Sequence, residues 1–338
     1  MIALVESPGA GKGDGGRTMI ERIKLATFVL FLAGAAVAAP ARGSEATMGP
    51  IWIGVVREDG FLLPVARLKS GTWSTPWPEA QRDLDSPVFS GLQVPSAWVG
   101  GDSALPEKWR LHPSQDAPVL LRASAVKKIE SHCSELWAVK TDLGKPAVSD
   151  DSWPMSKAGA ASSGGMKIRT FALVSSTALR QEALDFLDAR FSEWQDWAAK
   201  QSKTHRERSR QKGRPQKVEL GDLECIETPG PGGRLCHFGA SRRFGEDQAA
   251  EESCDIRFEA DGWFLAKNGS LRLLSKQVGF GDCDMNGAAS ETPLGLFSVG
   301  EADHVLVETD DYESEGYSIL RVGEDRIETL VSVPGGGC

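Results

Sequence analysis

The sequence predicts a mainly β protein, in which antiparallel meander sheets form a sandwich or a partly closed barrel in two lobes. Short apolar runs alternate with turn signals along most of the chain, as in IWIGVVR and FLLPVARL on either side of an Asp-Gly turn. One segment near the middle instead spaces its apolar side chains by three and four residues, as a long amphipathic helix does. We therefore expect β lobes at 49–175 and 218–338, with a helix and linker at 176–217 between them.

The N-terminal lobe begins with an apolar strand, a turn at Asp59-Gly60 and a second strand in which Pro64 indicates an edge or a bulge. Residues 79–116 and 143–166 are rich in Gly, Pro, Ser and Asp and are expected to form loops. Further strands are predicted at APVLLRASAV, ELWAVKTDL and MKIRTFALVSS.

A helix is predicted from about Ala178 to Gln201, with one apolar face and one charged face. The apolar face contains Leu184, Leu187, Phe191, Trp194 and Ala198. The basic stretch at 200–217 follows, and it is expected to be a solvated hinge between the lobes. It lacks the interleaved aromatic residues of a single-strand nucleic-acid binder.

The C-terminal lobe has the pattern of a meander. CDIRFE, WFLAK and SLRLLSK are divided by predicted turns at Ala260-Asp261-Gly262 and at Lys267-Asn268-Gly269. HVLVET, YSILRV and RIETLVSV follow, divided by an acidic loop and by a Gly-Glu-Asp turn at 323–325.

Residues 19–41 have the features of a cleavable export signal. Arg22 and Lys24 precede an apolar run that ends in the cleavage pattern Ala36-Val37-Ala38, with Ala39-Pro40-Ala41 as a second option. The alternative is a membrane anchor, but the run is short and rich in Ala and Gly. Residues 1–18 are expected to be a non-native leader, with translation starting at Met19. We expect a mature protein of the periplasm or cell exterior that does not span a membrane.

The composition narrows the range of partners. The chain has 338 residues, with 38 basic and 47 acidic side chains and a formal net charge of −9. This acidity argues against a general binder of nucleic acid or of anionic membranes. An apolar content of 41% is enough for a substantial core.

Six cysteines follow the signal, and an even number in an exported chain indicates disulfides. They are Cys133, Cys225, Cys236, Cys254, Cys283 and Cys338. Cys225 and Cys236 lie symmetrically about Gly230-Pro231, so a hairpin there would place them opposite each other across two strands. The alternative is a wide loop with each cysteine bonded elsewhere. Cys338 is expected to pair with Cys283 or Cys254.

The loop GFGDCDMNGAASETP contains the first half of a calcium-binding pattern. Asp282, Asp284 and Asn286 precede Gly287 at the spacing of an EF-hand loop, and their oxygens could converge on Ca²⁺. Position twelve is Pro293, and Glu291 could substitute only in a different geometry. The alternative is a turn capped by Asp and Asn side chains, with no cofactor bound.

Tryptophan and carboxylates are the other candidate binding groups. Seven tryptophans lie in the N-terminal lobe, where exposed rings could stack on sugars, although core packing is the usual role of this residue. They are Trp52, Trp73, Trp77, Trp98, Trp109, Trp137 and Trp153. An acidic group surrounds Tyr312, and two of its carboxylates could serve as acid and base on a glycoside. It contains Glu308, Asp310, Asp311, Glu313 and Glu315.

Other catalytic motifs are missing from the sequence. His132-Cys133 are adjacent strand residues that point to opposite faces, and the five histidines have no clustered zinc spacing. There is no G-x-S-x-G, P-loop or dinucleotide-binding pattern.

We therefore expect an exported, non-catalytic binding or structural module whose partner is a glycan or another cell-surface component. The alternatives are a secreted glycan-active enzyme or glycan-binding protein with a Trp-lined cleft, and a calcium-stabilised extracellular module.

Overall fold

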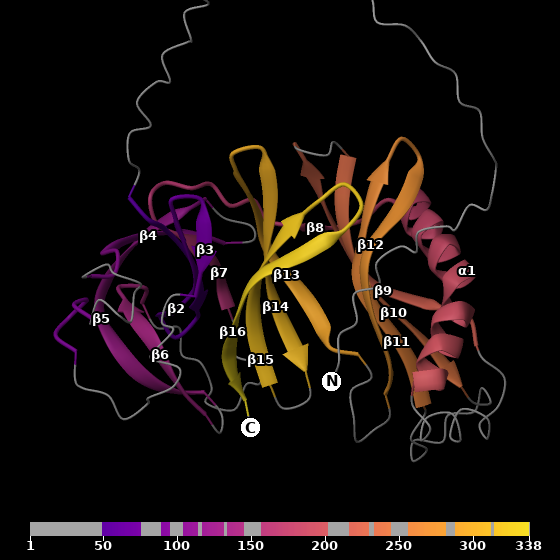
Figure 1. The fold of residues 1–338 in the computed structure, drawn as a ribbon, viewed down its shortest axis with the longest axis horizontal. Coiled ribbons are helices and arrows are strands. Elements are labelled where there is room, and N and C mark those ends of the chain that lie inside the picture. Colours follow the sequence, from indigo (N-terminus) through magenta and orange to yellow (C-terminus); the bar gives the residue numbers. More distant parts are fainter. Residues whose placement is uncertain are drawn as a thin grey trace, which may run out of the picture. The chain divides into compact units, whose positions relative to one another are not determined.

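The computed structural model confirms a mainly β fold with antiparallel sheets and one long helix (Figure 1). It describes residues 49–75, 89–94, 104–113, 117–131, 134–144, 157–201, 216–229, 233–244, 256–281, 288–311 and 314–337. The chain from Gly49 onward is one compact unit. The predicted leader, the predicted export signal and most of the basic linker lie outside the described residues, and the two-lobe division stays a prediction.

The first sheet is a partly closed barrel. It contains β1 (Ile51–Arg57), β2 (Phe61–Lys69), β3 (Thr72–Ser74), β4 (Lys108–His112), β5 (Val119–Ser131), β6 (Ser134–Thr141) and β7 (Lys157–Ser162). Pairing runs in the order β1-β7-β4-β5-β6-β2, and β1 also pairs with β2, so six strands enclose a core while β3 extends from β2.

The first hairpin forms as predicted. Gly60 has a φ of 84°, a conformation that glycine adopts without strain, and its N–H donates to the carbonyl of Arg57. Gly54 pairs with Pro64 while the preceding residue of β1 pairs with Ala66, so β2 has one extra residue at this point. The structure thus confirms the bulge that Pro64 indicated.

Two loop predictions in this region are wrong, because β4 lies within 79–116 and β7 lies within 143–166. The small residues of β7 that resembled a loop are needed for close packing. Ala160 and Ala161 are fully buried. A Cβ on Gly159 would lie 2.6 Å from the carbonyl oxygen of His112, so only glycine fits between β7 and β4 there.

The second sheet carries the helix on one face (Figure 1). It contains β8 (Ala172–Leu173), β9 (Glu219–Thr228), β10 (Gly233–Phe244), β11 (Ile256–Lys267) and β12 (Ser270–Gly281), in the order β12-β11-β10-β9-β8. Helix α1 (Thr177–Gln201) confirms the predicted helix, and Leu187 and Phe191 on its apolar face are fully buried against this sheet. No helix among the described residues is long and apolar enough to cross a membrane.

Strand β11 corrects the predicted turn at 260–262. The strand runs without interruption through Asp261 and Gly262 and pairs with β10 on one side and β12 on the other. A Cβ on Gly262 would lie 2.4 Å from the carbonyl oxygen of Ser275. This glycine therefore permits close strand approach, whereas the predicted turn at Asn268-Gly269 is confirmed, with φ of 53° and 70°.

The third sheet is buried on both faces along its two central strands. It contains β13 (Ser290–Val299), β14 (Ala302–Asp311), β15 (Ser314–Val322) and β16 (Ile327–Gly337), paired in that order. Leu306 and Ile319 pack in a core shared with the barrel, whereas Val305 and Leu320 pack in a core shared with the second sheet. Alternate residues of β14 and β15 therefore belong to different cores.

Cys225 of β9 and Cys236 of β10 are opposed residues of one hairpin and form the predicted disulfide. Both side chains belong to the core between the second sheet and α1. Cys133, Cys254, Cys283 and Cys338 lie outside the described residues, so their pairing stays a prediction.

Candidate functional site

The predicted calcium ligands Asp282, Asp284 and Asn286 lie outside the described residues, between β12 and β13. The structure therefore leaves the calcium hypothesis as a prediction.

The tryptophans that the structure describes serve mainly in packing. Trp52 and Trp109 are each only 1% exposed, and Trp73 and Trp137 pack against core residues. The ring of Trp73 lies edge-on to Phe297 of the third sheet, with 5.9 Å between ring centroids. Trp77, Trp98 and Trp153 lie outside the described residues.

An open depression of about 500 Å³ lies beside the start of α1. Its lining includes Leu179 and Glu182 of the helix, Arg234 of β10 and the β11–β12 turn around Lys267. It contains none of the residues of the two buried polar clusters described next, so we place the candidate chemistry in those clusters.

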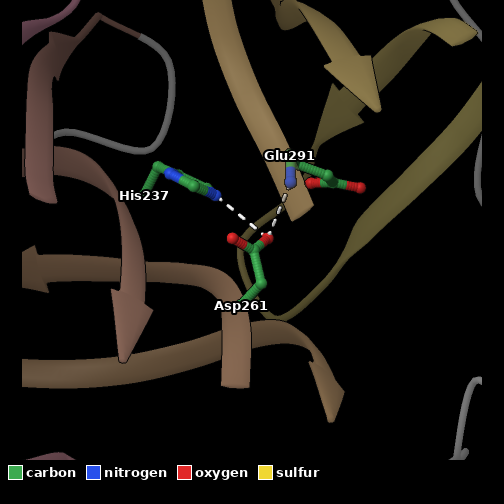
Figure 2. Close-up of side chains that lie close together, drawn as sticks. All are labelled: His237, Asp261 and Glu291. Atoms are coloured by element: carbon green, nitrogen blue, oxygen red, sulfur yellow. Dashed lines mark hydrogen bonds and ion pairs between the residues drawn. The ribbon is translucent and has the colours of Figure 1, made fainter. Parts of the chain in front are cut away.

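The first cluster contains His237 of β10, Asp261 of β11 and Glu291 of β13, and is called the histidine cluster (Figure 2). The imidazole Nε2 of His237 lies 3.1 Å from Oδ1 of Asp261. The same carboxylate oxygen accepts a hydrogen bond of 3.2 Å from the backbone N–H of Glu291. Because β13 belongs to the third sheet, the cluster joins two sheets.

Strand register explains why these side chains meet. Leu235, Trp263 and Leu265 of the second sheet face the third sheet and form an apolar core with it. His237 and Asp261 lie two residues further along the same faces of β10 and β11, so they face the third sheet at the edge of this core. Both side chains are only 8% exposed.

Two further side chains hold the carboxylate of Glu291. The indole N–H of Trp263 donates to Oε2, and the amide of Gln277 donates to Oε1 over 3.2 Å. The Trp263 ring also lies beside the His237 ring, with 4.8 Å between centroids. Strands from both sheets therefore orient the cluster through hydrogen bonds and ring contact.

Burial changes the acid–base properties of the cluster. Burial raises the pKa of Asp261 and of Glu291, against the hydrogen bonds from His237 and Trp263. Burial by itself would lower the pKa of His237, but the hydrogen bond and charge of Asp261, with the charges of Glu291 and Glu224, raise it overall. The two carboxylates that face His237 therefore raise the pKa of its imidazole, although burial opposes this.

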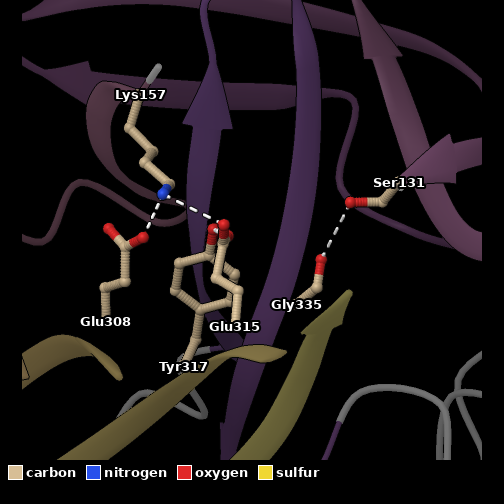
Figure 3. A network of polar contacts seen from close by, with 6 residues as sticks. All are labelled: Ser131, Lys157, Glu308, Glu315, Tyr317 and Gly335. Atoms are coloured by element: carbon tan, nitrogen blue, oxygen red, sulfur yellow. Dashed lines mark hydrogen bonds and ion pairs between the residues drawn. The ribbon is translucent and has the colours of Figure 1, made fainter. Parts of the chain in front are cut away.

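The second cluster joins the barrel to the third sheet and is called the lysine cluster (Figure 3). It contains Lys157 of β7, Glu308 of β14, and Glu315 and Tyr317 of β15. The ammonium of Lys157 contacts both carboxylates directly and lies 3.2 Å from Oε2 of Glu315. The hydroxyl of Tyr317 donates a short hydrogen bond to Oε1 of Glu315.

Two carboxylates and one ammonium leave this cluster with excess negative charge. Burial raises the pKa of Glu308 to about 7, even though Lys157 donates to it. Burial raises the pKa of Asp310, which lies beside the cluster, and burial and the carboxylates of Glu315 and Glu308 raise the pKa of Tyr317. Glu308 can therefore exchange a proton near neutral pH.

Hydrogen bonds from the C-terminal strand extend this junction. The hydroxyl of Ser131 donates to the carbonyl of Gly335 (Figure 3). The N–H of Gly337 donates to the hydroxyl of Ser134 over 3.0 Å. A Cβ on Gly336 would lie 2.4 Å from the hydroxyl oxygen of Ser131. The terminal glycines therefore let β16 approach the barrel closely.

Sequence reasoning found only part of these clusters. It identified Glu308, Asp310 and Glu315 as a group, and the structure brings their carboxylates together. Glu313 and Tyr312 lie outside the described residues. It missed Lys157, which lay in an expected loop, and Asp261, which lay in an expected turn. Leu235 and His237 are two residues apart, as are Asp261 and Trp263, so each polar residue shares a strand face with an apolar one. This spacing was the signal in the sequence that the polar residues lie beside a core.

Searches for related proteins find no matching family model, no matching curated protein and no matching solved structure. The functional argument therefore depends on the two clusters.

Proposed function

We propose that this chain is an exported protein of the periplasm or cell exterior that acts as a non-catalytic binding or structural module. The observation that carries the structural part is the position of the two clusters. Each is built from two different sheets, and its charged groups contact one another. Charged groups that contact one another across two sheets hold the layers of a rigid scaffold together.

The lysine cluster favours this reading over glycoside hydrolysis. A glycosidase needs two carboxylates with a sugar between them. Here the ammonium of Lys157 lies between Glu308 and Glu315, and both carboxylate side chains are at most 5% exposed. A substrate would have to displace a buried ion pair, which is costly because it leaves unpaired charge.

The Cys225–Cys236 disulfide supports the export part of the proposal. Structural disulfides persist in oxidising compartments and are rare in the cytosol. Residues 19–41 also support export, because a basic start is followed by an apolar run and a small-residue cleavage pattern, as in a signal peptide.

Export is tested by expressing the chain from Met19 in a bacterium with a periplasm. We expect a periplasmic product whose N-terminus, read by mass spectrometry, follows Ala38 or Ala41. Leu30→Arg combined with Leu32→Arg breaks the apolar run and should leave uncleaved protein in the cytosol, while the mature sequence stays unchanged. Cytosolic, uncleaved protein from the unaltered sequence would refute export.

The non-catalytic role is tested separately on the purified mature protein. Cell-wall and capsular polysaccharides are incubated with the protein and with the Glu315→Gln variant, and new reducing ends are measured. We expect none from either protein. Hydrolysis that disappears in the variant would establish the enzyme in place of the scaffold.

A further inference from the structure

We propose that His237, Asp261 and Glu291 bind one divalent transition-metal ion of the zinc type at the junction between the second and third sheets (Figure 2). This site would give the module a ligand, and it does not depend on the proposed export.

The donor set matches this class of metal. Imidazole nitrogen and carboxylate oxygen are both ligands of Zn²⁺, and catalytic Zn²⁺ sites use three protein ligands and keep a fourth position for water or substrate. A nitrogen ligand argues against Ca²⁺ and Mg²⁺, which prefer oxygen ligands. Borderline ions such as Zn²⁺ and Co²⁺ accept both nitrogen and oxygen donors.

The separations of the donor atoms are close to those that a metal needs. One ligand atom from each residue lies within 4.8 Å of the others. Tetrahedral Zn²⁺ with bonds of about 2.1 Å places neighbouring ligand atoms roughly 3.4 Å apart. Nε2 of His237 and Oδ1 of Asp261 are already 3.1 Å apart. An oxygen of Glu291, which lies within 4.8 Å of these two atoms, would complete the site by approaching them to about 3.4 Å.

Outer hydrogen bonds already orient the ligands. Trp263 and Gln277 hold the two oxygens of Glu291, and the backbone N–H of Glu291 holds Asp261. Such second-shell donors are a regular feature of metal sites, where they fix the orientation of each ligand. All three ligands also come from paired strands, which position side chains more rigidly than loops do.

The histidine cluster and the lysine cluster differ in the basic group that faces their carboxylates. In the histidine cluster two carboxylates, with Glu224 nearby, face a single imidazole. In the lysine cluster the ammonium of Lys157 already contacts Glu308 and Glu315. A neutral imidazole nitrogen can bind a divalent ion together with the two carboxylates, whereas the ammonium of Lys157 has no free electron pair and cannot be a metal ligand.

The test uses the mature protein after treatment with a chelator. Zn²⁺ and Co²⁺ are titrated by calorimetry, and the visible spectrum of bound Co²⁺ reports its coordination. We expect one equivalent of either metal and a rise in melting temperature with metal. Asp261→Asn and Glu291→Gln keep the side-chain shapes and should each weaken binding by more than about tenfold, since even second-shell changes typically cost about 10–100-fold.

Two matched variants locate the site. Glu308→Gln alters a similarly buried carboxylate of the lysine cluster and should bind both metals as the parent does. Asp282→Asn combined with Asp284→Asn removes the predicted calcium loop and should also bind them unchanged. The Trp263→Phe variant should bind about tenfold more weakly, because Glu291 loses a supporting donor.

Three results would overturn the proposal. They are no stoichiometric binding of Zn²⁺ or Co²⁺, equal affinity in the parent, Asp261→Asn and Glu291→Gln proteins, and loss of binding in the Asp282/Asp284 variant alone. Far-UV circular dichroism of each metal-free variant verifies that it is folded. If one carboxylate variant fails to fold, the other decides the question.

Discussion

The environment of Glu308 shows how a residue's position controls its chemistry. Its carboxylate is buried between the barrel and the third sheet, while Glu301, in the turn before the same strand, is exposed. Burial disfavours the charged form of a carboxyl group, and the neighbouring Glu315 adds to this effect. Burial in the junction therefore makes Glu308 take up a proton more readily than its ordinary pKa would allow.

The pH dependence of stability follows from Glu308. Its pKa rises from 4.5 to about 7 on folding, so the folded protein holds a proton that the unfolded chain releases. This contribution is complete below about pH 4.5 and is lost as the pH rises through about 7. The loss of this contribution should therefore lower the free energy of unfolding of the parent by on the order of 3 kcal/mol as the pH rises through this range, because one pKa unit corresponds to about 1.4 kcal/mol. Glu308→Gln should abolish this decrease.

Urea unfolding of the parent and of Glu308→Gln at several pH values between about 4.5 and 8 measures this difference. Glu301→Gln is the control and should follow the parent at every pH. A difference between the parent and Glu308→Gln that does not change with pH would contradict the assignment.

At the scale of elements, strand β11 illustrates how local signals and packing compete. Ala260-Asp261-Gly262 has the composition of a turn, and Lys267-Asn268-Gly269 has nearly the same composition. The second forms a turn with positive φ at both central positions, but the first continues a strand. Strands β10 and β12 pair with β11 on both sides through Gly262, and this pairing determines its conformation.

We predict that Gly262→Ala destabilises the protein by about 1–3 kcal/mol, the usual cost of adding a methyl group to a close-packed site. The new Cβ would lie 2.4 Å from the carbonyl oxygen of Ser275 and 3.2 Å from the ring of Phe238. Chemical denaturation measures the change. Gly239→Ala on the adjacent strand is the matched control, because nothing lies within 4 Å of its Cβ position.

Gly239→Ala should be neutral or slightly stabilising, since alanine reduces the entropy of the unfolded chain. Equal effects of the two substitutions would show that close approach of β11 and β12 is not the reason for glycine at 262.

At the scale of the whole molecule, the third sheet lies between two hydrophobic cores. One core is shared with the barrel and the other with the second sheet. A polar cluster lies beside each core: the lysine cluster on the barrel side and the histidine cluster on the other side. The two clusters therefore contribute to how the third sheet packs against the barrel and against the second sheet.

Removal of Lys157 should weaken the junction between the barrel and the third sheet. Lys157→Met leaves Glu308 and Glu315 buried without their cation, which should cost about 3–5 kcal/mol at pH 8. The loss should be smaller at pH 5, where Glu308 can take up a proton. Lys157→Met combined with Glu308→Gln should recover part of the loss, and thermal unfolding at both pH values measures it.

The control is Lys128→Met, which breaks a partly exposed ion pair with Glu135 in the same barrel. This change should cost no more than about 1 kcal/mol. Equal losses from the two lysine variants would contradict the role given to the buried junction.

Sequence patterns were sufficient to predict the mainly β class, the helix from about Ala178 to Gln201 and the first hairpin, and they offered the Cys225–Cys236 pair as one of two alternatives. Each depends on contacts between residues close in the chain, so periodicity and turn residues are sufficient to predict them. The sequence also grouped Glu308 with Glu315, because one hairpin joins them.

Three features could not be predicted without the tertiary structure: strand β7, the burial of Asp261 and the proximity of His237 to Glu291. These features arise where segments far apart in the chain pack together. The amino-acid composition of a segment gives no information about such contacts. Small residues that resemble a loop form a strand when two neighbouring strands approach closely. Polar residues become a candidate metal site when two sheets bring them to the edge of a shared core.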